Sequence, residues 1–284
     1  MPDTVETLLR HINKDLATQN STDKPTSYDA ALLLSHVLNR STTALRTWPD
    51  HLVSAFEKNH FMQLWSRRLK GEPIAYLLGQ APFRDFSLFV TPDTLIPRPE
   101  TEEVVTWILT QFSSQTAYSV LDLGTGSGAI ALALARERPA WKITATDYAE
   151  PALRLAKKNA AALHIDSIAW YQGNWFSALP DTTHFDLIVS NPPYIAPDDP
   201  HLQQHGLSYE PQSALVAEKE GYADIEHLIA EAPRYLHPQG WLVLEHGYTQ
   251  GEKVRDLFEA QSYQAIHTHR DYGGQERFTV GVKV

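Results

Sequence analysis

Hydrophobic side chains in residues 1–70 recur at intervals of three and four, which is the spacing of amphipathic helices. Gly71 and Pro73 end this pattern. We therefore predict a small helical domain over residues 1–72. The positions that set the pattern are Leu8, Leu9, Ile12, Leu16, Leu33, Leu34, Val37, Leu38, Leu52, Phe56, Leu64, Trp65 and Leu69.

The segment after this domain looks extended. Residues 83–90 have the composition of a β-strand, and prolines then follow in the pairs Thr91-Pro92, Ile96-Pro97 and Arg98-Pro99. Proline fixes φ and lacks an N–H donor, so a chain punctuated in this way runs between regular elements. We predict a hairpin or linker over residues 73–97.

From about residue 98, short apolar runs alternate with stretches of helical spacing. Strands and helices that take turns along the chain are typical of a parallel α/β sheet. The last two runs have no helix between them, which predicts a terminal antiparallel hairpin. The expected helices are 100–112, 128–137 and 151–162, and the expected strands are 119–123, 142–146, 168–171, 185–190, 241–245, 264–269 and 278–282.

Composition narrows the class of protein. The 284 residues carry a net charge of −10 without a block of Lys or Arg, which argues against stable nucleic-acid binding because phosphate contacts dominate that affinity. The absence of cysteine excludes disulfides, thiolate nucleophiles and cysteine-bound zinc. No apolar run reaches the roughly 18 to 20 residues of a membrane span. We expect a cytoplasmic protein with no membrane partner.

A glycine-rich turn follows the first strand of the α/β region. In a doubly wound sheet, a ligand binds at such a turn. Asp147 ends the next strand about 20 residues later, where a carboxylate accepts hydrogen bonds from a ribose. Ala129 stands where a dinucleotide site requires its third glycine, so the turn favours S-adenosylmethionine over NAD. The candidate cofactor residues of the turn are Gly124, Thr125, Gly126, Ser127 and Gly128.

Two residues near this turn each admit two interpretations. Asp122 precedes the glycines, and it either binds the cationic amino acid end of the cofactor or caps the turn. Trp175 follows the third strand, and it either stacks on adenine or packs in the core. Both alternatives stay open on the sequence.

The fourth strand ends in Asn191-Pro192-Pro193-Tyr194. Asn-Pro readily begins a turn, but two prolines also fix the backbone and leave carbonyl oxygens free to accept hydrogen bonds. An amide nitrogen is a poor nucleophile, so the main catalytic task is to hold it in line with a methyl group. Asn191 and the Pro192 carbonyl can each accept from one N–H of a planar amide, and Tyr194 can pack on its plane. We predict Asn191, Pro192 and Tyr194 as catalytic residues, and all four as substrate-binding residues.

With these residues, the chain resembles the HemK/PrmC family of protein-glutamine methyltransferases, which act on peptide chain release factors. The resemblance covers nearly the whole length. Beyond motifs that methyltransferases share, it rests on residues 71–79 (GEPIAYLLG), 95–102 (LIPRPETE) and 209–215 (YEPQSAL). It implies a Rossmann-like class I S-adenosylmethionine-dependent methyltransferase domain over residues 98–284. It also implies methylation of the glutamine side-chain nitrogen in a Gly-Gly-Gln motif.

The resemblance assigns cofactor contacts residue by residue. It implies that residues 124–128, Asp147, Trp175 and Asn191 contact S-adenosylmethionine. Asn174 departs from the family pattern, in which an Asp often precedes the aromatic residue. An amide at this position still offers an oxygen to the adenine amino group, so the departure weakens the expected contact without removing it.

The resemblance also implies which residues lie near the substrate. Residues 191–194 hold the glutamine, and the helical domain with the linker selects the release factor. Arg98, Pro99, Glu100 and Glu210 are further positions near the substrate. The structural alternatives are helix capping by Glu100, a surface turn at Arg98, and a helical domain that serves for packing or dimerisation and binds no substrate.

Three other functions fit the same core. Relatives methylate a glutamine of a ribosomal protein, and adenine-N6 methyltransferases use a similar Asn-Pro-Pro-aromatic motif because that nitrogen is also a conjugated NH₂ group. The negative charge and the missing Lys/Arg footprint oppose the nucleic-acid alternative. A cofactor-binding protein without catalysis is the third alternative, and the intact motif at residues 191–194 opposes it.

Some motifs suggest functions that we do not assign. Gly273-Gly274-Gln275 repeats the tripeptide of release factors, but it lies between two expected strands, so a hairpin turn is favoured over self-methylation of Gln275. His201 and His205 have the spacing of metal ligands on a helix, yet no third ligand is evident, and we expect no metal. A lone histidine such as His246 is usually structural.

Overall fold

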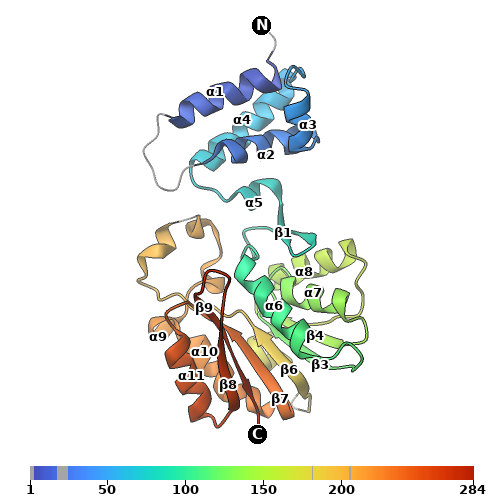
Figure 1. Cartoon of the computed structure of the whole chain (residues 1–284), viewed down its shortest axis with the longest axis vertical. Coiled ribbons are helices and arrows are strands. Elements are labelled where there is room, and N and C mark those ends of the chain that lie inside the picture. Colours follow the sequence, from blue (N-terminus) through green and yellow to red (C-terminus); the bar gives the residue numbers. More distant parts are fainter. Residues whose placement is uncertain (1–2, 18–24, 181, 205) are drawn as a thin grey trace. The chain divides into compact units, whose positions relative to one another are not determined.

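The computed structural model describes residues 3–17, 25–180, 182–204 and 206–284. The chain divides into two compact units, which are drawn in Figure 1. Unit 1 comprises Met1–Gln80 and Pro200–Tyr209, and unit 2 comprises Ala81–Asp199 and Glu210–Val284. Unit 1 therefore takes two separate segments of the chain.

Unit 1 is helical, as the spacing of its hydrophobic residues predicts. Two of its helices begin with a capping box, in which Thr26 or Ser54 accepts a hydrogen bond from the third residue of the helix. Their inner faces bury Leu33, Leu34 and Phe61. The helices are α1 (Val5–Ala17), α2 (Ser27–Leu38), α3 (Thr42–Thr47), α4 (Ala55–Leu69), α5 (Ile74–Leu78), η2 (Pro200–Gln203) and η3 (Leu207–Tyr209).

The predicted pattern is wrong at three positions of unit 1. Leu52 is 58% exposed, Phe56 is 80% exposed and Leu69 is 43% exposed, so none of them belongs to the core. Leu52 forms an isolated antiparallel bridge with Thr4, and α4 begins only at Ala55. Within α4, Phe61, Leu64 and Trp65 pack inward at the predicted helical spacing.

A β-hairpin lies within residues 73–97, where the sequence predicts a hairpin or linker, and its turn interrupts the strand expected over residues 83–90. Its strands are β1 (Gln80–Phe83) and β2 (Phe86–Phe89). Asn159, which is buried on α8 (Glu150–Ala162), bonds both the N–H and the carbonyl of Phe89, at 2.7 and 3.0 Å. The same side chain donates to the Ser127 carbonyl at 2.8 Å. Asn159 thus fixes the hairpin to the glycine turn.

Unit 2 is built on a seven-stranded sheet in the order β5-β4-β3-β6-β7-β9-β8. All pairings are parallel except those of β9, which is antiparallel to β7 and to β8. The predicted parallel sheet and its terminal antiparallel hairpin are confirmed. The strands are β3 (Ser119–Leu123), β4 (Lys142–Asp147), β5 (Ala169–Gln172), β6 (Phe185–Ser190), β7 (Leu236–Glu245), β8 (Gln264–Arg270) and β9 (Glu276–Val282).

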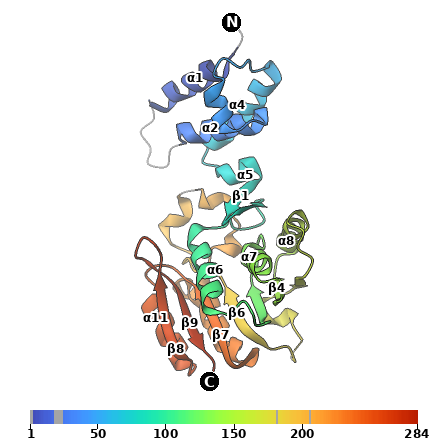
Figure 2. The ribbon, with the colours of Figure 1, turned by 45° about the vertical axis from the view of Figure 1, so that its right-hand side comes forward.

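Helices cover both faces of this sheet because its strands are apolar on both sides. Along β3, Val120 packs in one core and Leu121 and Leu123 in the other. Helices α6, α7 and α8 cover one face, and α10 and α11 cover the other (Figure 2). The elements not yet placed are α6 (Pro99–Gln111), α7 (Ala129–Glu137), η1 (Trp175–Ala178), η4 (Gln212–Ala214), α9 (Glu218–Gly221), α10 (Ala223–Glu231), η5 (Ala232–Arg234) and α11 (Gly251–Ala260).

None of the described helices is long and apolar enough to cross a membrane.

Candidate active site

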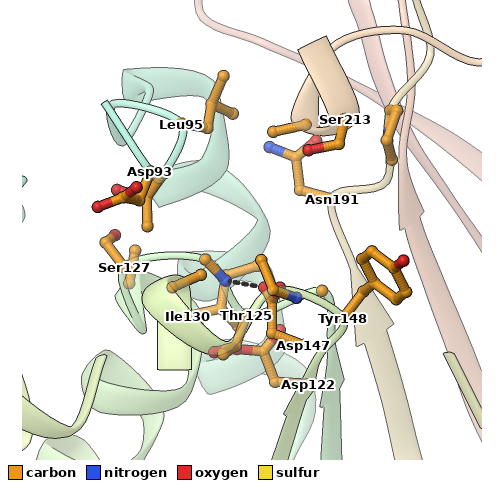
Figure 3. Close-up of a pocket in the computed structure, with 18 of the residues that line it drawn as sticks. Asp93, Leu95, Asp122, Thr125, Ser127, Ile130, Asp147, Tyr148, Asn191 and Ser213 are labelled. Atoms are coloured by element: carbon orange, nitrogen blue, oxygen red, sulfur yellow. Dashed lines mark hydrogen bonds between the residues drawn. The ribbon is translucent and has the colours of Figure 1, made fainter. Parts of the chain in front are cut away.

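A cavity of about 230 Å³ lies in unit 2 at the carboxyl ends of the parallel strands. Strands β4 and β5 lie on one side of β3, and the chain then returns to form β6 on the other side of β3. In open α/β sheets, ligands bind at this switch point. In Figure 3, Asn191 and Ser213 lie apart from the group formed by Asp122, Thr125 and Asp147, with the cavity lined by both sets.

The glycine turn joins β3 to α7 along one wall of the cavity. The N–H of Thr125 donates to the carbonyl of Thr146 at 2.9 Å, which ties the turn to the end of β4. Gly124 has a φ of +70°, and a Cβ there would lie 3.1 Å from the ring of Trp175. Only glycine satisfies both conditions without strain. The turn therefore lets a flat ring approach its backbone closely.

Asp147 anchors the glycine turn through its carboxylate. Its Oδ2 accepts from the N–H of Gly126 and its Oδ1 from the N–H of Ala149, both at 2.8 Å. Burial raises the pKa of this carboxyl, while the two N–H donors act in the opposite direction. Each carboxylate oxygen keeps a further lone pair. Asp147 can therefore hold the turn and also accept from ligand hydroxyl groups.

Asp122 has one carboxylate oxygen in use and one without a partner. Its Oδ2 accepts from the Thr125 hydroxyl at 2.6 Å and from the N–H of Ala131 at 3.1 Å. Its Oδ1 is buried and has no hydrogen-bond partner. Burial raises the pKa of Asp122 to about 7. Because the side chain lines the cavity, the two interpretations left open by the sequence are compatible: Oδ2 caps the turn, and Oδ1 is available to a cationic group.

Trp175 is held at the cavity wall by its backbone and by a hydrogen bond. Its φ is +50°, which is uncommon for a residue with a Cβ. Its indole N–H donates to Oδ1 of Asp224 on α10 at 3.1 Å. The ring also packs against the core on that face of the sheet. Trp175 therefore serves the core and offers a fixed aromatic surface beside Gly124.

Asn191 lines the cavity immediately after β6. Its Nδ2 donates to the hydroxyl of Thr101 on α6 at 3.2 Å, and that hydroxyl donates to Oε2 of Glu245 on β7 at 2.8 Å. Glu245 is 2% exposed, and burial raises its pKa to about 7. With Nδ2 engaged, the side-chain oxygen of Asn191 remains to accept a hydrogen bond from a ligand.

The other end of the Asn-Pro-Pro-Tyr motif is held by two elements. The Tyr194 carbonyl accepts from Nε2 of Gln250, which precedes α11, at 3.1 Å. Gly221, at the end of α9, approaches the same carbonyl so closely that a Cβ would lie 2.3 Å from its oxygen. Burial raises the pKa of the Tyr194 hydroxyl well above its usual value, so this group stays neutral. The motif is therefore held at both ends.

Arg98 and Glu210 form an ion pair beside the cavity. Arg98 Nη2 lies 2.5 Å from Oε1 of Glu210, whose side chain is 1% exposed. Glu210 also accepts from the N–H of Ile96 at 3.0 Å. This pair joins the loop before α6 to the segment after the motif, so a plain surface turn at Arg98 is excluded. Glu100 lies in the first turn of α6, and its Oε1 is 3.9 Å from Nη2 of Arg277.

The cavity brings together most of the residues expected from the sequence, including residues 124–127, Asp147, Trp175, Asn191 and Pro193. Gly128, Pro192 and Tyr194 are not among its lining residues, and their ligand contacts stay predictions. The loop before α6 forms another wall, which agrees with the placement of Arg98 near the substrate that the resemblance over residues 95–102 implies. The lining residues that the sequence did not single out are Asp93, Thr94, Leu95, Pro97, Thr101, Ile130, Tyr148, Ala149, Ala152, Gly173, Ser213, Ala214 and Asp224.

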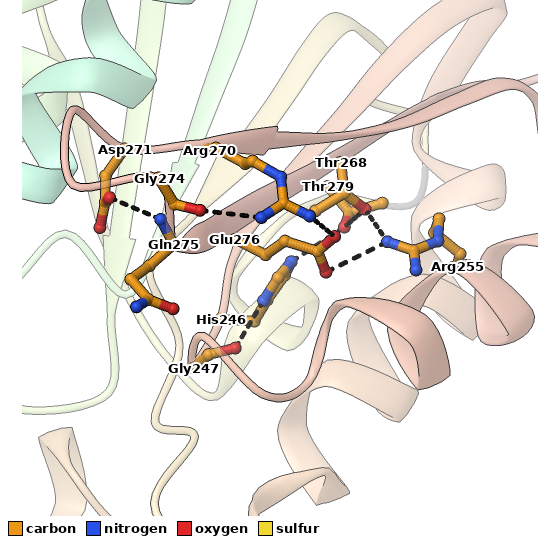
Figure 4. Close-up of polar contacts among 10 residues, drawn as sticks. All are labelled: His246, Gly247, Arg255, Thr268, Arg270, Asp271, Gly274, Gln275, Glu276 and Thr279. Atoms are coloured by element: carbon orange, nitrogen blue, oxygen red, sulfur yellow. Dashed lines mark hydrogen bonds and ion pairs between the residues drawn. The ribbon is translucent and has the colours of Figure 1, made fainter.

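Gly273-Gly274-Gln275 forms the turn between β8 and β9, as expected (Figure 4). The N–H of Asp271 donates to the Gln275 carbonyl at 2.8 Å, and Gly274 has a φ of +81°. His246 lies behind this hairpin with both ring nitrogens within 2.9 Å of partners, the Gly247 carbonyl and the Thr279 hydroxyl. Burial lowers the pKa of His246. These contacts are those of a structural histidine.

His205 lies outside the described residues, so its spacing from His201 is not tested. Among the residues that are described, no group of three or more His, Cys, Asp or Glu is arranged to hold a metal ion.

Two family models match the chain. The PrmC N-terminal domain matches residues 7–79, and the Methyltransferase small domain matches residues 102–205. Curated relatives align over nearly the whole length. The release factor glutamine methyltransferase of Aliivibrio fischeri is 46% identical over 98% of this chain and 96% of its own. That of Escherichia coli K12 is 44% identical over 96% of this chain and 98% of its own.

Solved structures share the fold at low identity. A methyltransferase from Pyrococcus furiosus aligns with a TM-score of 0.54 and 18% identity, over 78% of this chain and 98% of its own. The catalytic domain of hMettl16 aligns with a TM-score of 0.58 and 18% identity, over 76% of this chain and 83% of its own. These similarities show the methyltransferase fold of the chain.

Proposed function

The chain belongs to the family of release factor glutamine methyltransferases, and from this premise we propose that it methylates the side-chain amide nitrogen of a glutamine in peptide chain release factors. The methyl donor is S-adenosylmethionine, and the target is the glutamine of the Gly-Gly-Gln motif. One observation carries the proposal: a single cavity contains the glycine turn, Asp147 and Asn191. The enzyme acts in the cytoplasm, and stable binding of nucleic acid is not part of its function.

The residues around the cavity fit S-adenosylmethionine. Residues 124–128 provide a backbone that a ligand can approach, and Asp147 has free lone pairs for ribose hydroxyls. The unpartnered Oδ1 of Asp122 matches an ammonium group. The fixed ring of Trp175 supports stacking of adenine. When bound, S-adenosylmethionine would supply a methyl group on a positively charged sulfur; the sulfur–methyl bond would break as the nitrogen–methyl bond forms, and neutral S-adenosylhomocysteine would be the leaving group.

In the proposed mechanism, Asn191 and Pro192 position the nucleophilic nitrogen. The Asn191 side-chain oxygen accepts one N–H of the glutamine amide, since its own NH₂ group is engaged by Thr101. The Pro192 carbonyl accepts the other N–H, and Pro193 and Tyr194 form the surface against which the amide plane packs. The nitrogen loses one proton to solvent during or after transfer, so no strong base is required. Positioning supplies the rate enhancement.

Unit 1 is the proposed recognition domain. Its first segment, Met1–Gln80, contains the helical domain predicted over residues 1–72, and the connection predicted over residues 73–97 leads to the methyltransferase domain predicted over residues 98–284. This assignment rests on the match of residues 7–79 to the PrmC N-terminal domain. In this proposal, the helical surface binds the release factor outside the methylated motif, and the cavity binds the glutamine.

Mass spectrometry of a purified release factor after incubation with the protein and S-adenosylmethionine tests the function. We expect a gain of one methyl mass on the peptide that contains Gly-Gly-Gln, and none in a release factor whose glutamine is replaced by alanine. No gain would refute release factors as substrates, and the same assay on ribosomal proteins and on adenine-containing nucleic acid would then test the two alternatives.

Asn191→Ala tests the proposed chemistry. Loss of one positioned polar contact should lower kcat on the order of 10²-fold at saturating substrate. The matched control is Asn174→Ala, another asparagine of the cavity wall, measured with S-adenosylmethionine and substrate both saturating. This change removes an expected contact to adenine and should raise KM for S-adenosylmethionine, but it should leave kcat within a few fold of wild type. Wild-type kcat in Asn191→Ala would contradict the mechanism.

A further inference from the structure

Two buried polar residues stand behind Asn191 and take no direct part in the proposed chemistry. Thr101, on the first turn of α6, is 4% exposed, and Glu245, at the end of β7, is 2% exposed. They form a chain of hydrogen bonds in which Asn191 Nδ2 donates to Thr101 at 3.2 Å and Thr101 donates to Glu245 at 2.8 Å. Buried polar groups cost free energy unless they are hydrogen-bonded, so the presence of two of them behind Asn191 calls for a reason.

The direction of this chain follows from the number of protons available. A threonine hydroxyl has one proton, and an ionised carboxylate can only accept. The Thr101 proton therefore points to Glu245, and the Thr101 oxygen must accept from its other neighbour. Of the two ends of the Asn191 amide, only the NH₂ group can donate. An ionised Glu245 thus forces the NH₂ group of Asn191 toward Thr101 and leaves its oxygen for the substrate.

We propose that Thr101 and Glu245 are positioning residues that set which end of the Asn191 amide is presented to the substrate nitrogen. The inference rests on the proposed function, in which Asn191 accepts from the glutamine NH₂ group. The opposite orientation would place two NH₂ groups against each other, and no hydrogen bond would form. Glu245 acts through Thr101 and touches neither the substrate nor the cofactor.

The charge of Glu245 controls the direction of the chain. A protonated Glu245 can donate to Thr101, which frees the Thr101 proton to donate in turn to the Asn191 oxygen and so permits the opposite orientation. The charged groups that act on Glu245 are Glu100 on α6, Arg98 before α6 and Arg277 on β9, and the neutral hydroxyl of Tyr194 also lies near it. Burial raises the pKa of Glu245 to about 7, the arginines oppose this effect, and Glu100 adds to it.

The first test compares variants at position 101. Thr101→Val keeps the shape of the side chain and removes the hydroxyl, whereas Thr101→Ser keeps the hydroxyl. We expect Thr101→Val to lower kcat by about 10- to 100-fold, with KM for S-adenosylmethionine within about twofold of wild type, because misorientation of a catalytic group affects the chemical step. Thr101→Ser should restore most of the loss. Equal kcat values in Thr101→Val and Thr101→Ser would overturn the proposal.

The second test uses pH. In wild type, kcat at saturating cofactor should fall as pH decreases through the pKa of Glu245, because protonation reverses the chain. Glu245→Gln cannot ionise, so its kcat should be reduced at all pH values. Its plot of kcat against pH should lack the limb that falls with decreasing pH. Asp122 titrates in the same range in the free protein, but saturation with a cationic cofactor favours its ionised form. Persistence of the limb in Glu245→Gln would overturn the assignment to Glu245.

A third readout does not depend on turnover. The side-chain amide of Asn191, labelled with ¹⁵N and assigned by its loss in Asn191→Ser, should shift with pH in wild type and show no such shift in Glu245→Gln. A wild-type protein that shifts but does not methylate release factors would refute the proposed function and support the orientation by Glu245. An amide signal that is insensitive to pH in wild type would refute the orientation while leaving the function intact.

Discussion

Asp122 shows how a binding residue can cost stability. Its Oδ1 is buried without a partner, and such an atom costs on the order of 1 to 3 kcal/mol. Burial raises its pKa from 3.8 to about 7, and that of Glu245 from 4.5 to about 7. The folded protein therefore binds protons more tightly than the unfolded chain at these two sites. Their contribution to stability is full below the unfolded pKa values and is lost as pH rises through about 7.

This dependence of stability on pH leads to a prediction for the ligand-free protein. Its free energy of unfolding should decrease between about pH 4 and pH 7 from these two sites. Asp122→Asn should show a smaller decrease and a higher stability at pH 7, measured by urea denaturation across that range. The same variant should bind S-adenosylhomocysteine more weakly in calorimetry, because the acceptor for the ammonium group is lost. Identical slopes of stability against pH in the two proteins would contradict the assignment.

Asp147 anchors the glycine turn and is also the proposed ribose contact, and two substitutions should affect these roles to different extents. Asp147→Ala removes the acceptors of Gly126 and Ala149 as well as the proposed ribose contact, and should weaken binding of S-adenosylhomocysteine by about 10- to 100-fold. Asp147→Asn keeps one oxygen acceptor and should lose less affinity. Calorimetry measures both dissociation constants, and unchanged affinity in Asp147→Ala would refute the ribose contact.

The sequence predicts a site residue correctly where the place of that residue at the end of a strand defines its role. Gly124, Asp147 and Asn191 each lie at the carboxyl end of a predicted strand, so the fold alone brings them to one edge of the sheet. Thr101 could not be found in this way, because it lies 90 residues from Asn191 and 144 residues from Glu245 along the chain. Only the packing of α6 against the sheet makes these three residues neighbours.

At the scale of elements, the loop of the Asn-Pro-Pro-Tyr motif, residues 191–194, lies close against α9. Gly221 has a φ of +88°, and a Cβ there would lie 2.3 Å from the Tyr194 carbonyl oxygen. The loop must move if this position carries a side chain. The hydrogen bond from Gln250 to the same carbonyl would be disturbed with it.

Gly221→Ala should therefore reduce kcat at least about 10-fold, since small displacements of positioned groups are costly. Gly274→Ala is the matched control, because Gly274 also has a positive φ of +81° but a Cβ there meets nothing within 4 Å. Both variants should lose about 1 to 2 kcal/mol of stability from backbone strain. Only Gly221→Ala should lose activity, in the release factor assay, and equal activities would contradict the role of α9.

The presence of each strand of the large sheet was predicted more accurately than the residues at which it begins and ends. Residues 241–245 were expected as a strand, but β7 begins at Leu236, because His237, Pro238 and Gln239 are exposed and give no apolar signal. The reverse error concerns Leu52 and Phe56, whose apolar side chains fit a helical spacing yet are exposed. The spacing of apolar residues shows which side chains could share a buried helix face. Which of them are buried depends on where the helix begins.

At the scale of the whole molecule, cofactor binding should affect the two units differently. All residues of the cavity belong to unit 2. Differential scanning calorimetry should resolve two transitions, and S-adenosylhomocysteine should shift only one of them. At 100 times its dissociation constant, a ligand adds about 2.7 kcal/mol, which corresponds to roughly 5 to 10 °C for a unit of this size. A single transition that shifts as a whole would show that the units unfold together.

The membership of Pro200–Tyr209 in unit 1 has a consequence for the evolution of this architecture. The chain crosses between the units three times, after Gln80, after Asp199 and after Tyr209. Recombination at a single point can exchange residues 1–80, but it leaves the second segment behind, inserted shortly after the Asn-Pro-Pro-Tyr motif. A replacement for residues 1–80 therefore has to be compatible with an existing insertion after this motif. The two units are expected to be inherited together, and to diversify by substitution in place of domain shuffling.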